Sequence, residues 1–107
     1  MEKETEMDEY ISSYYGDDQV AAVITVKVDT KEADKVATEI SNFDIVEDVF
    51  LVTGDTDIIA KAKFRNYRGL KDFVMQSLAP IRGIKETKTL MVVTTYKEGG
   101  QSRLAPD

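Results

Sequence analysis

The stretch IVEDVFLVTGDTDIIAKAKFR, residues 45–65, contains two β-rich runs on either side of a four-residue turn. The first run, Ile45 to Thr53, is apolar over residues 49–52, and the second, Ile58 to Arg65, alternates apolar with basic side chains. Between them lies Gly54-Asp55-Thr56-Asp57, whose glycine and aspartates favour a tight turn. The stretch therefore predicts two antiparallel strands joined as a hairpin.

A strand and a helix are expected before this hairpin, and a helix and a strand after it. Val20 to Val28 is a β-rich run, and Asp29-Thr30 can cap a helix whose apolar residues follow a helical spacing. The apolar positions of that helix are Ala33, Val36, Ala37 and Ile40. Asn66 can cap a second helix, which Pro80 ends, and Ile84 to Tyr96 is the last β-rich run. The order β-α-β-β-α-β predicts an α+β, ferredoxin-like fold, a four-stranded antiparallel sheet with two helices on one face.

The other face of this sheet would be left uncovered by the chain itself. Apolar side chains are expected on it, whereas a solvated antiparallel face is normally polar. A second copy of the chain would therefore bury it, in an oligomer of the dimeric α/β-barrel type. The residues expected at this dimer interface are Val23, Thr25, Val49, Leu51, Met91 and Val93, with Ala21 beside them.

The composition limits the chemistry that the chain can perform. Its 107 residues suffice for one small domain, with 42% hydrophobic and 32% charged residues. The absence of cysteine and histidine removes disulfides, thiolate and imidazole metal ligands, and the commonest nucleophile and general base. The two aspartates of the Gly54–Asp57 turn offer too few oxygens for a metal site. We therefore expect no enzyme activity, no metal and no cofactor.

The net charge of −6 lies entirely in the first 18 residues. They contain seven acidic residues and one lysine, whereas residues 19–107 contain 13 acidic and 13 basic residues. A balanced body with an acidic leader lacks the cationic surface that nucleic acid requires, so direct DNA binding is not expected. The chain has no apolar run long enough for a membrane span and no signal-peptide pattern, which predicts a cytoplasmic protein.

These features divide the chain into an acidic leader (1–18), a folded domain (19–97) and a flexible tail (98–107). The apolar residues of the leader recur at the helical spacings of three, one and three. They are Met7, Tyr10, Ile11 and Tyr14. Two interpretations of the leader stay open: a solvated acidic tail, or a short amphipathic helix that docks on a partner subunit.

Two stretches of the domain resemble a known family. Residues 46–59, VEDVFLVTGDTDII, are similar to the second strand, Gly-Asp hairpin and third strand of the effector-binding (RAM) domain of Lrp/AsnC transcriptional regulators. Residues 83–93, GIKETKTLMVV, are similar to the glycine, paired threonines and final apolar strand of that family. The resemblance covers about Val20 to Lys97. Family regulators carry a helix-turn-helix domain ahead of this one, and the leader is too short and too acidic for it. The chain therefore resembles a stand-alone effector domain.

The resemblance implies that a small amino acid binds between dimers of a ring-like assembly, with the hairpin Thr53-Gly54-Asp55-Thr56-Asp57 as the central contact. The two aspartates could accept hydrogen bonds from an ammonium group. The turn N–H groups and the two threonine hydroxyls could donate to a carboxylate. An alternative stays open, in which the aspartates only cap the turn through local backbone bonds. Position 56 is often aromatic in the family, so Thr56 leaves the identity of the ligand open.

The expected function is that of an amino-acid-binding effector domain, which forms a homo-oligomer and modulates transcription or amino-acid metabolism through partners. Those partners would be further copies of the chain, in a dimer or in an octamer or decamer, and full-length Lrp/AsnC-type regulators. One alternative is a ligand-free oligomerisation module that assembles with such regulators. An ACT-like regulatory domain and an enzyme of the dimeric ferredoxin-like type are two others.

Overall fold

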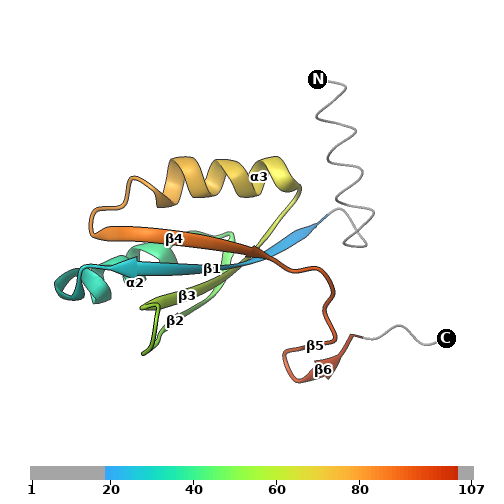
Figure 1. The fold of residues 1–107 in the computed structure, drawn as a ribbon. Helices are drawn as coiled ribbons and strands as arrows, with labels where there is room; N and C mark the ends of the chain where they lie inside the picture. The colour runs from blue at the N-terminus through green and yellow to red at the C-terminus, as the bar shows by residue number, and fades with distance from the viewer. Residues whose placement is uncertain (1–18, 104–107) are drawn as a thin grey trace.

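The computed structural model describes residues 19–103, so the leader and residues 104–107 lie outside the described part. One antiparallel sheet has the strand order β2-β3-β1-β4 (Figure 1). Its strands are β1 (Val20–Val28), β2 (Val46–Leu51), β3 (Ile58–Phe64) and β4 (Ile84–Met91). The helical connections are η1 (Thr30–Glu32) continued by α2 (Ala33–Ser41), and α3 (Tyr67–Asp72) continued by η2 (Phe73–Leu78). The predicted element order and the ferredoxin-like fold class are confirmed.

Both helices pack on one face of the sheet, which we call the helix side. Every second side chain of β1 and β3 is buried there, as the alternation in their sequences predicts. Val36 and Ile40 of α2 and Leu70 of α3 are buried against this row. Among residues 19–103, the buried core consists of Val20, Ala22, Ile24, Val26, Val28, Val36, Ile40, Ile58, Ala60, Ala62, Phe64, Leu70, Phe73, Leu78 and Ile81.

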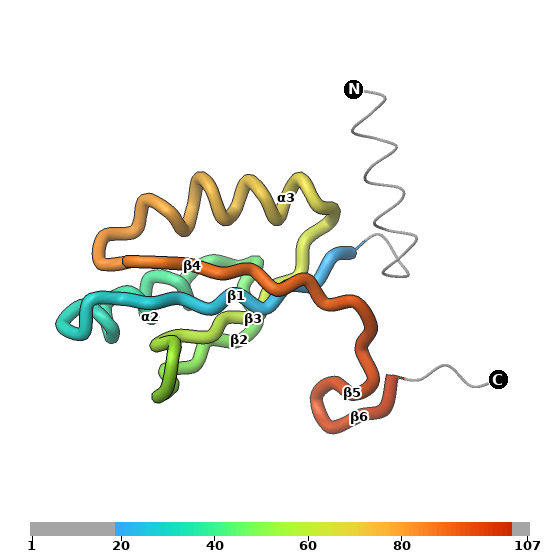
Figure 2. The backbone as a smooth tube through the Cα atoms, viewed as in Figure 1, coloured from blue at the N-terminus to red at the C-terminus, as the bar shows by residue number. Residues whose placement is uncertain are grey.

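The last strand is shorter than its apolar sequence suggests. The Val92 N–H still donates to the carbonyl of Ala21 at 2.9 Å, but β4 ends at Met91 rather than at Tyr96. The reason is that β1, the neighbour of β4, begins at Val20, so the chain beyond has no strand to pair with. It turns away from the sheet into a small hairpin, β5 (Lys97–Glu98) and β6 (Gln101–Ser102), as Figure 2 shows. Ordered structure thus extends past Lys97, where the sequence suggested a flexible tail.

The second helix changes its winding halfway. It begins at Tyr67, where the Asn66 side chain accepts a hydrogen bond from the Gly69 N–H at 2.9 Å, as the predicted N-cap should. From Phe73 to Leu78 it is a π-helix, in which N–H groups bond to carbonyls five residues earlier. This winding places Phe73 and Leu78, five residues apart, on the same buried face. A regular α-helix would have turned one of them away from the core.

Gly83, in the turn before β4, has no room for a side chain. Its φ is +103°, and a Cβ there would lie 2.8 Å from the Cβ of Glu32. We expect Gly83→Ala to lower the free energy of unfolding by about 2 kcal/mol, and the Tm by roughly 8–16 °C, in a thermal melt. Gly54→Ala is the control, because Gly54 has φ +132° but nothing within 4 Å of its Cβ position, and should cost about 1 kcal/mol. Equal losses would contradict a packing role for Gly83.

Candidate functional site

The β2–β3 turn is attached to the end of β1 by two side chains of the predicted ligand loop. The Thr56 hydroxyl donates to the carbonyl of Val26 at 3.1 Å. The Asp57 carboxylate accepts a hydrogen bond from the backbone N–H of Val28 at 3.0 Å. Both contacts are partly buried and join residues about 30 positions apart in the sequence. Thr56 and Asp57 therefore have structural roles, although the Asp57 bond is to a neighbouring strand and not to its own turn.

The other polar residues of the turn remain available to a ligand. Thr53 and Asp55 are exposed, and Gly54 allows the chain to reverse between them with a φ of +132°. The Asp55 carboxylate forms no hydrogen bond or ion pair with any of residues 19–103. Of the two aspartates expected to receive an ammonium group, only Asp55 has an unpaired carboxylate in this part of the chain.

A depression of about 250 Å³ lies beside the turn, on the face of the sheet opposite the helices. We call this face the open face. Acidic and basic side chains from different strands meet in the depression, together with hydroxyl groups and one leucine. The lining residues are Thr25, Lys27, Asp55, Thr56, Glu86, Lys88 and Leu90. Such a lining offers both an acceptor for a cation and donors for an anion within one small site.

Four of these lining residues were not predicted from the sequence: Lys27, Glu86, Lys88 and Leu90. They come from β1 and β4, and the antiparallel register brings them together, with Lys27 opposite Glu86 and Thr25 opposite Lys88. The sequence contains a signal for them, because Glu86, Lys88 and Leu90 alternate on one face of a strand. Their closeness to Asp55 depends on the pairing of β1 between β3 and β4.

The Asp57 contact predicts a loss of stability that is separate from any ligand. Asp57→Ala leaves the partly buried Val28 N–H without its acceptor, which should cost about 1–3 kcal/mol in the free energy of unfolding. Urea unfolding followed by circular dichroism measures this loss. Asp55→Ala removes a carboxylate from the same turn that has no partner there, and its unfolding midpoint should stay unchanged. Equal destabilisation by both substitutions would show that the Asp57 bond is not structural.

The predicted dimer-interface residues do not all lie on the open face. Paired residues of neighbouring strands share a face, and three of the predicted residues pair with core residues of the helix side. Val49 pairs with Ala60, Leu51 with Ile58, and Met91 with Ala22. The face assignment was wrong for these three because residues 49–52 and 90–93 are continuously apolar, so alternation does not decide which face each of them takes. Val93 lies beyond the end of β4.

Val23 and Thr25 do lie on the open face, where further apolar side chains accompany them. Phe50 is opposite Ile59 on β3, and Leu90 is opposite Val23 on β1. Phe50 is 55% exposed and Leu90 57% exposed. The open-face patch consists of Ala21, Val23, Thr25, Phe50, Ile59 and Leu90. Its role as a dimer interface stays a prediction.

The β5–β6 hairpin is attached through Glu98 to Lys61 and Lys63 of β3, on the open face. The Glu98 carboxylate accepts a hydrogen bond from Lys61 and forms ion pairs with Lys63 at 3.5 Å and Arg103 at 3.6 Å. The hydrogen bond from Lys61 holds the pKa of Glu98 below its usual 4.5, and the same bond raises the pKa of Lys61 above 10.5. The stabilisation that the charged Glu98 gives to this contact is lost as the pH falls through its lowered pKa. The stabilisation that the charged Lys61 gives is lost as the pH rises through its raised pKa. Between these limits the hairpin stays attached to β3.

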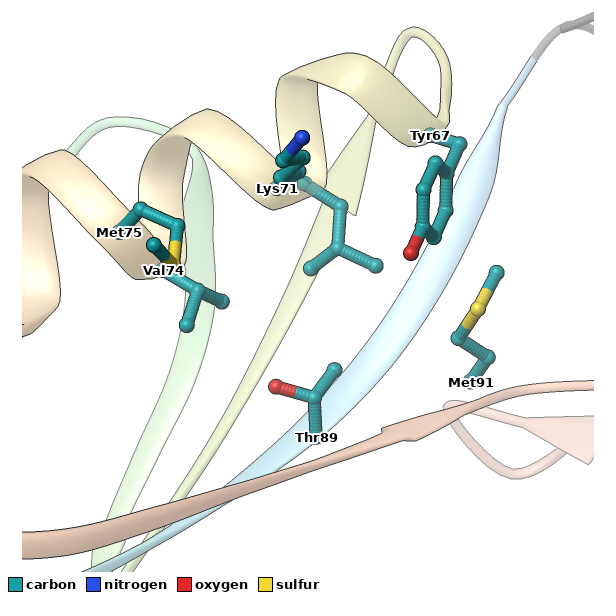
Figure 3. Close-up of a pocket in the computed structure, with 7 residues that line it drawn as sticks. Tyr67, Lys71, Val74, Met75, Thr89 and Met91 are labelled. Atoms are coloured by element: carbon teal, nitrogen blue, oxygen red, sulfur yellow. The ribbon is translucent and has the colours of Figure 1, made fainter.

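A second cavity, of about 260 Å³, lies on the helix side between α3 and β4 (Figure 3). It is lined by Tyr67, Leu70, Lys71, Val74, Met75, Thr89 and Met91. Its lining is mostly apolar, which distinguishes it from the charged depression beside the turn. Among residues 19–103, no group of three or more acidic side chains is placed to hold a metal ion. None of the described helices is long and apolar enough to cross a bilayer.

The model of the Lrp/AsnC ligand-binding domain matches residues 21–102. The chain belongs to the Lrp/AsnC family. A relative, an uncharacterised helix-turn-helix-type transcriptional regulator of Pyrococcus furiosus, is 30% identical over 86 residues. These residues are 80% of this chain and 57% of the relative, so the chain spans little more than half the relative's length.

Two solved structures share the fold of this chain. A Thermus thermophilus protein superposes with a TM-score of 0.69 at 23% identity, and covers 74% of this chain and 99% of its own. A transcriptional regulator of Neisseria meningitidis, solved in complex with L-methionine, has a TM-score of 0.66 at 25% identity. It covers 89% of this chain and 59% of its own. The Lrp/AsnC family, the ferredoxin-like fold and the resemblance of the domain to the ligand-binding domain of that family are thereby confirmed.

Proposed function

We propose that this Lrp/AsnC domain binds a small amino acid in the depression beside the β2–β3 turn. The observation that carries the proposal is that side chains of both charge signs line this depression. The acidic ones are Asp55 and Glu86, and the basic ones are Lys27 and Lys88. An amino acid is a zwitterion, which needs an acceptor for its ammonium group and donors for its carboxylate. The methionine complex of the Neisseria regulator supports the same class of ligand.

Asp55 is the acceptor best placed for the ammonium group, because its carboxylate has no partner among the described residues. Lys88 and the Thr25 hydroxyl can donate to the carboxylate, and Leu90 can contact an apolar side chain. The volume of about 250 Å³ lies below the ~300–1,000 Å³ of pockets for drug-sized molecules, which suits a small metabolite. Thr53 and Gly54, also residues of the predicted ligand loop, belong to the same turn but do not line the depression.

The open-face patch supports a second part of the proposal, the formation of a homo-oligomer. Leu90 and Thr25 belong both to this patch and to the depression, so a partner copy on the open face would also close the ligand site. A ligand that binds the assembled form more tightly than the single chain would stabilise the assembly. The assembly would then affect transcription through its protein partners. DNA would not be contacted by this domain itself.

A specific observation favours a second candidate, a ligand-free oligomerisation module that joins full-length Lrp/AsnC-type regulators. Lys88 Nζ lies 3.9 Å from the Glu86 carboxylate, so two of the four charges in the depression can neutralise each other. In that case the large exposed apolar side chains Phe50 and Leu90 would be the functional feature. Both candidates require the open face, and they differ in whether the depression is occupied.

A thermal-shift screen against the twenty amino acids at millimolar concentration tests the ligand. A ligand at 100 times its Kd adds about 2.7 kcal/mol to the free energy of unfolding, which raises the Tm by several degrees in a domain of this size. We expect one or a few selective amino acids to give this shift. A flat panel from a folded, oligomeric protein would contradict the amino-acid site and leave the oligomerisation module.

A further inference from the structure

The helix side of the sheet is incompletely covered at β4, its edge strand. Thr89 and Met91 of β4 pair with Ile24 and Ala22 of β1 and share their face. Ile24 and Ala22 are completely buried, whereas Thr89 is exposed and Met91 only half-buried. The two helices therefore cover β1 completely and cover β4 incompletely at Thr89 and Met91.

The space left over β4 is an apolar groove beside α3. We call it the α3–β4 groove, and its lining is Tyr67, Leu70, Lys71, Val74, Met75, Thr89 and Met91. Met75 is 63% exposed although it lines the groove. Figure 3 shows Tyr67 and Val74 directed from the helix toward Thr89 and Met91, while the ammonium group of Lys71 extends away from the strand. A groove of this composition fits the apolar face of another helix.

The path of the chain places the leader at one end of this groove. Val20, the first residue of β1, pairs with Phe64, which lies three residues before Tyr67 at the start of α3. Met91, also at this end, pairs with Ala22. The first residue of β1, Val20, therefore lies beside the mouth of the α3–β4 groove, and Figure 2 shows the start of β1 near the first turn of α3.

The leader matches the groove in length and in charge. From Met7 to Tyr14 a helix would rise about 10 Å, and the groove runs from Tyr67 to Met75, about 12 Å along α3. The link from Tyr14 to Val20 can span at most ~20 Å, enough to reverse the chain at the mouth. Residues 65–78 contain three basic residues and one acidic residue, opposite in sign to the leader, with its seven acidic residues and one lysine.

We propose that residues 7–14 of this chain dock as an amphipathic helix in the α3–β4 groove of the same molecule. Met7, Tyr10, Ile11 and Tyr14 would fill the groove, and the leader would run antiparallel to α3 as a third helix over β4. The sequence had left open a docking on a partner subunit, whereas the entry of the chain beside the groove favours its own. The open face lies on the other side of the sheet and stays free for a second copy.

Disulfide trapping tests this contact directly, because the native chain contains no cysteine. The full-length double variant Ile11→Cys, Met75→Cys should form an intramolecular disulfide under mild oxidation at least tenfold faster than Ile11→Cys, Gln76→Cys. Gln76 is also exposed, on the same helix, but it does not line the groove. Rates are normalised to the reaction of each single-cysteine variant with a small thiol reagent. Equal rates would overturn the proposal, and a disulfide formed only between chains would overturn docking within one molecule.

Oxidation of Met75 by dilute hydrogen peroxide, followed by mass spectrometry of peptides, gives an independent readout. Ile11→Asp places a charge in the apolar stripe of the leader and should speed oxidation of Met75 at least threefold. Ser12→Asp adds the same charge beside the stripe and should leave the rate unchanged. An unchanged rate in Ile11→Asp would show that the leader does not cover Met75 and would overturn the proposal.

Discussion

Replacing Leu90 with lysine is expected to convert the proposed homo-oligomer into monomers. Leu90 is 57% exposed in the single chain and lies on the open-face patch opposite Val23, so a partner copy would bury it. An unpaired charge buried at an interface costs about 3–5 kcal/mol, which weakens the Kd roughly a hundred- to several-thousand-fold. Size-exclusion chromatography with light scattering, at micromolar protein, measures the change.

Leu51→Lys is the matched control for this experiment. Leu51 has the same residue type and the same 57% exposure, but its pairing with Ile58 places it on the helix side. The dimer should survive this substitution, and circular dichroism should show that both variants are folded. A Leu90→Lys protein that keeps the mass of the unsubstituted protein would show that the open face is not the interface. The same would follow if Leu51→Lys alone dissociated.

Asp55→Ala is expected to abolish the response to the amino acid while the fold stays intact. The carboxylate would form a charge-assisted hydrogen bond with the ligand's ammonium group, and loss of such a bond costs about 1.5–3 kcal/mol. The Kd should therefore rise by about 10- to 150-fold, measured by isothermal titration calorimetry with the amino acid that gives the largest thermal shift.

Asp44→Ala supplies the control for net charge in that titration. Asp44 is an exposed carboxylate before β2 and does not line the depression, so its removal should leave the Kd unchanged. An unaltered Kd in Asp55→Ala would move the ammonium site away from the turn. Glu86 would then be the remaining acidic side chain of the depression to test.

The fold could be predicted from the sequence because each element carries its own local signal. The alternation in β1 and β3, the Asn66 cap and the Gly54–Asp57 turn depend on neighbours within a few residues. The faces of β2 and β4 could not be predicted in the same way. Residues 49–52 and 90–93 are continuously apolar, and only the pairing of Val49 with Ala60 and Met91 with Ala22 decides which side each residue takes.

The sequence indicated a candidate ligand loop but did not separate its structural residues from its exposed ones. The sequence indicated the five residues Thr53–Asp57 together, since glycine, aspartate and threonine suit both a turn and a ligand. The structure separates Thr56 and Asp57, which bond to Val26 and Val28 about 30 residues away, from the exposed Asp55. Contacts between residues so far apart in the sequence form only when the strands pair. The same pairing places Lys88 of β4 beside Thr25 of β1.

The π-helical segment η2 has a consequence for comparing this chain with its relatives. Each hydrogen bond of the π-helix encloses one residue more than a hydrogen bond of an α-helix. The segment Phe73–Leu78 is therefore equivalent to an α-helix with one inserted residue. Relatives with a regular α-helix at this place should align with a one-residue gap inside this segment. Shortening the chain by one residue there would leave a continuous α-helix, whereas the same deletion between Tyr67 and Leu70 would rotate Leu70 out of the core.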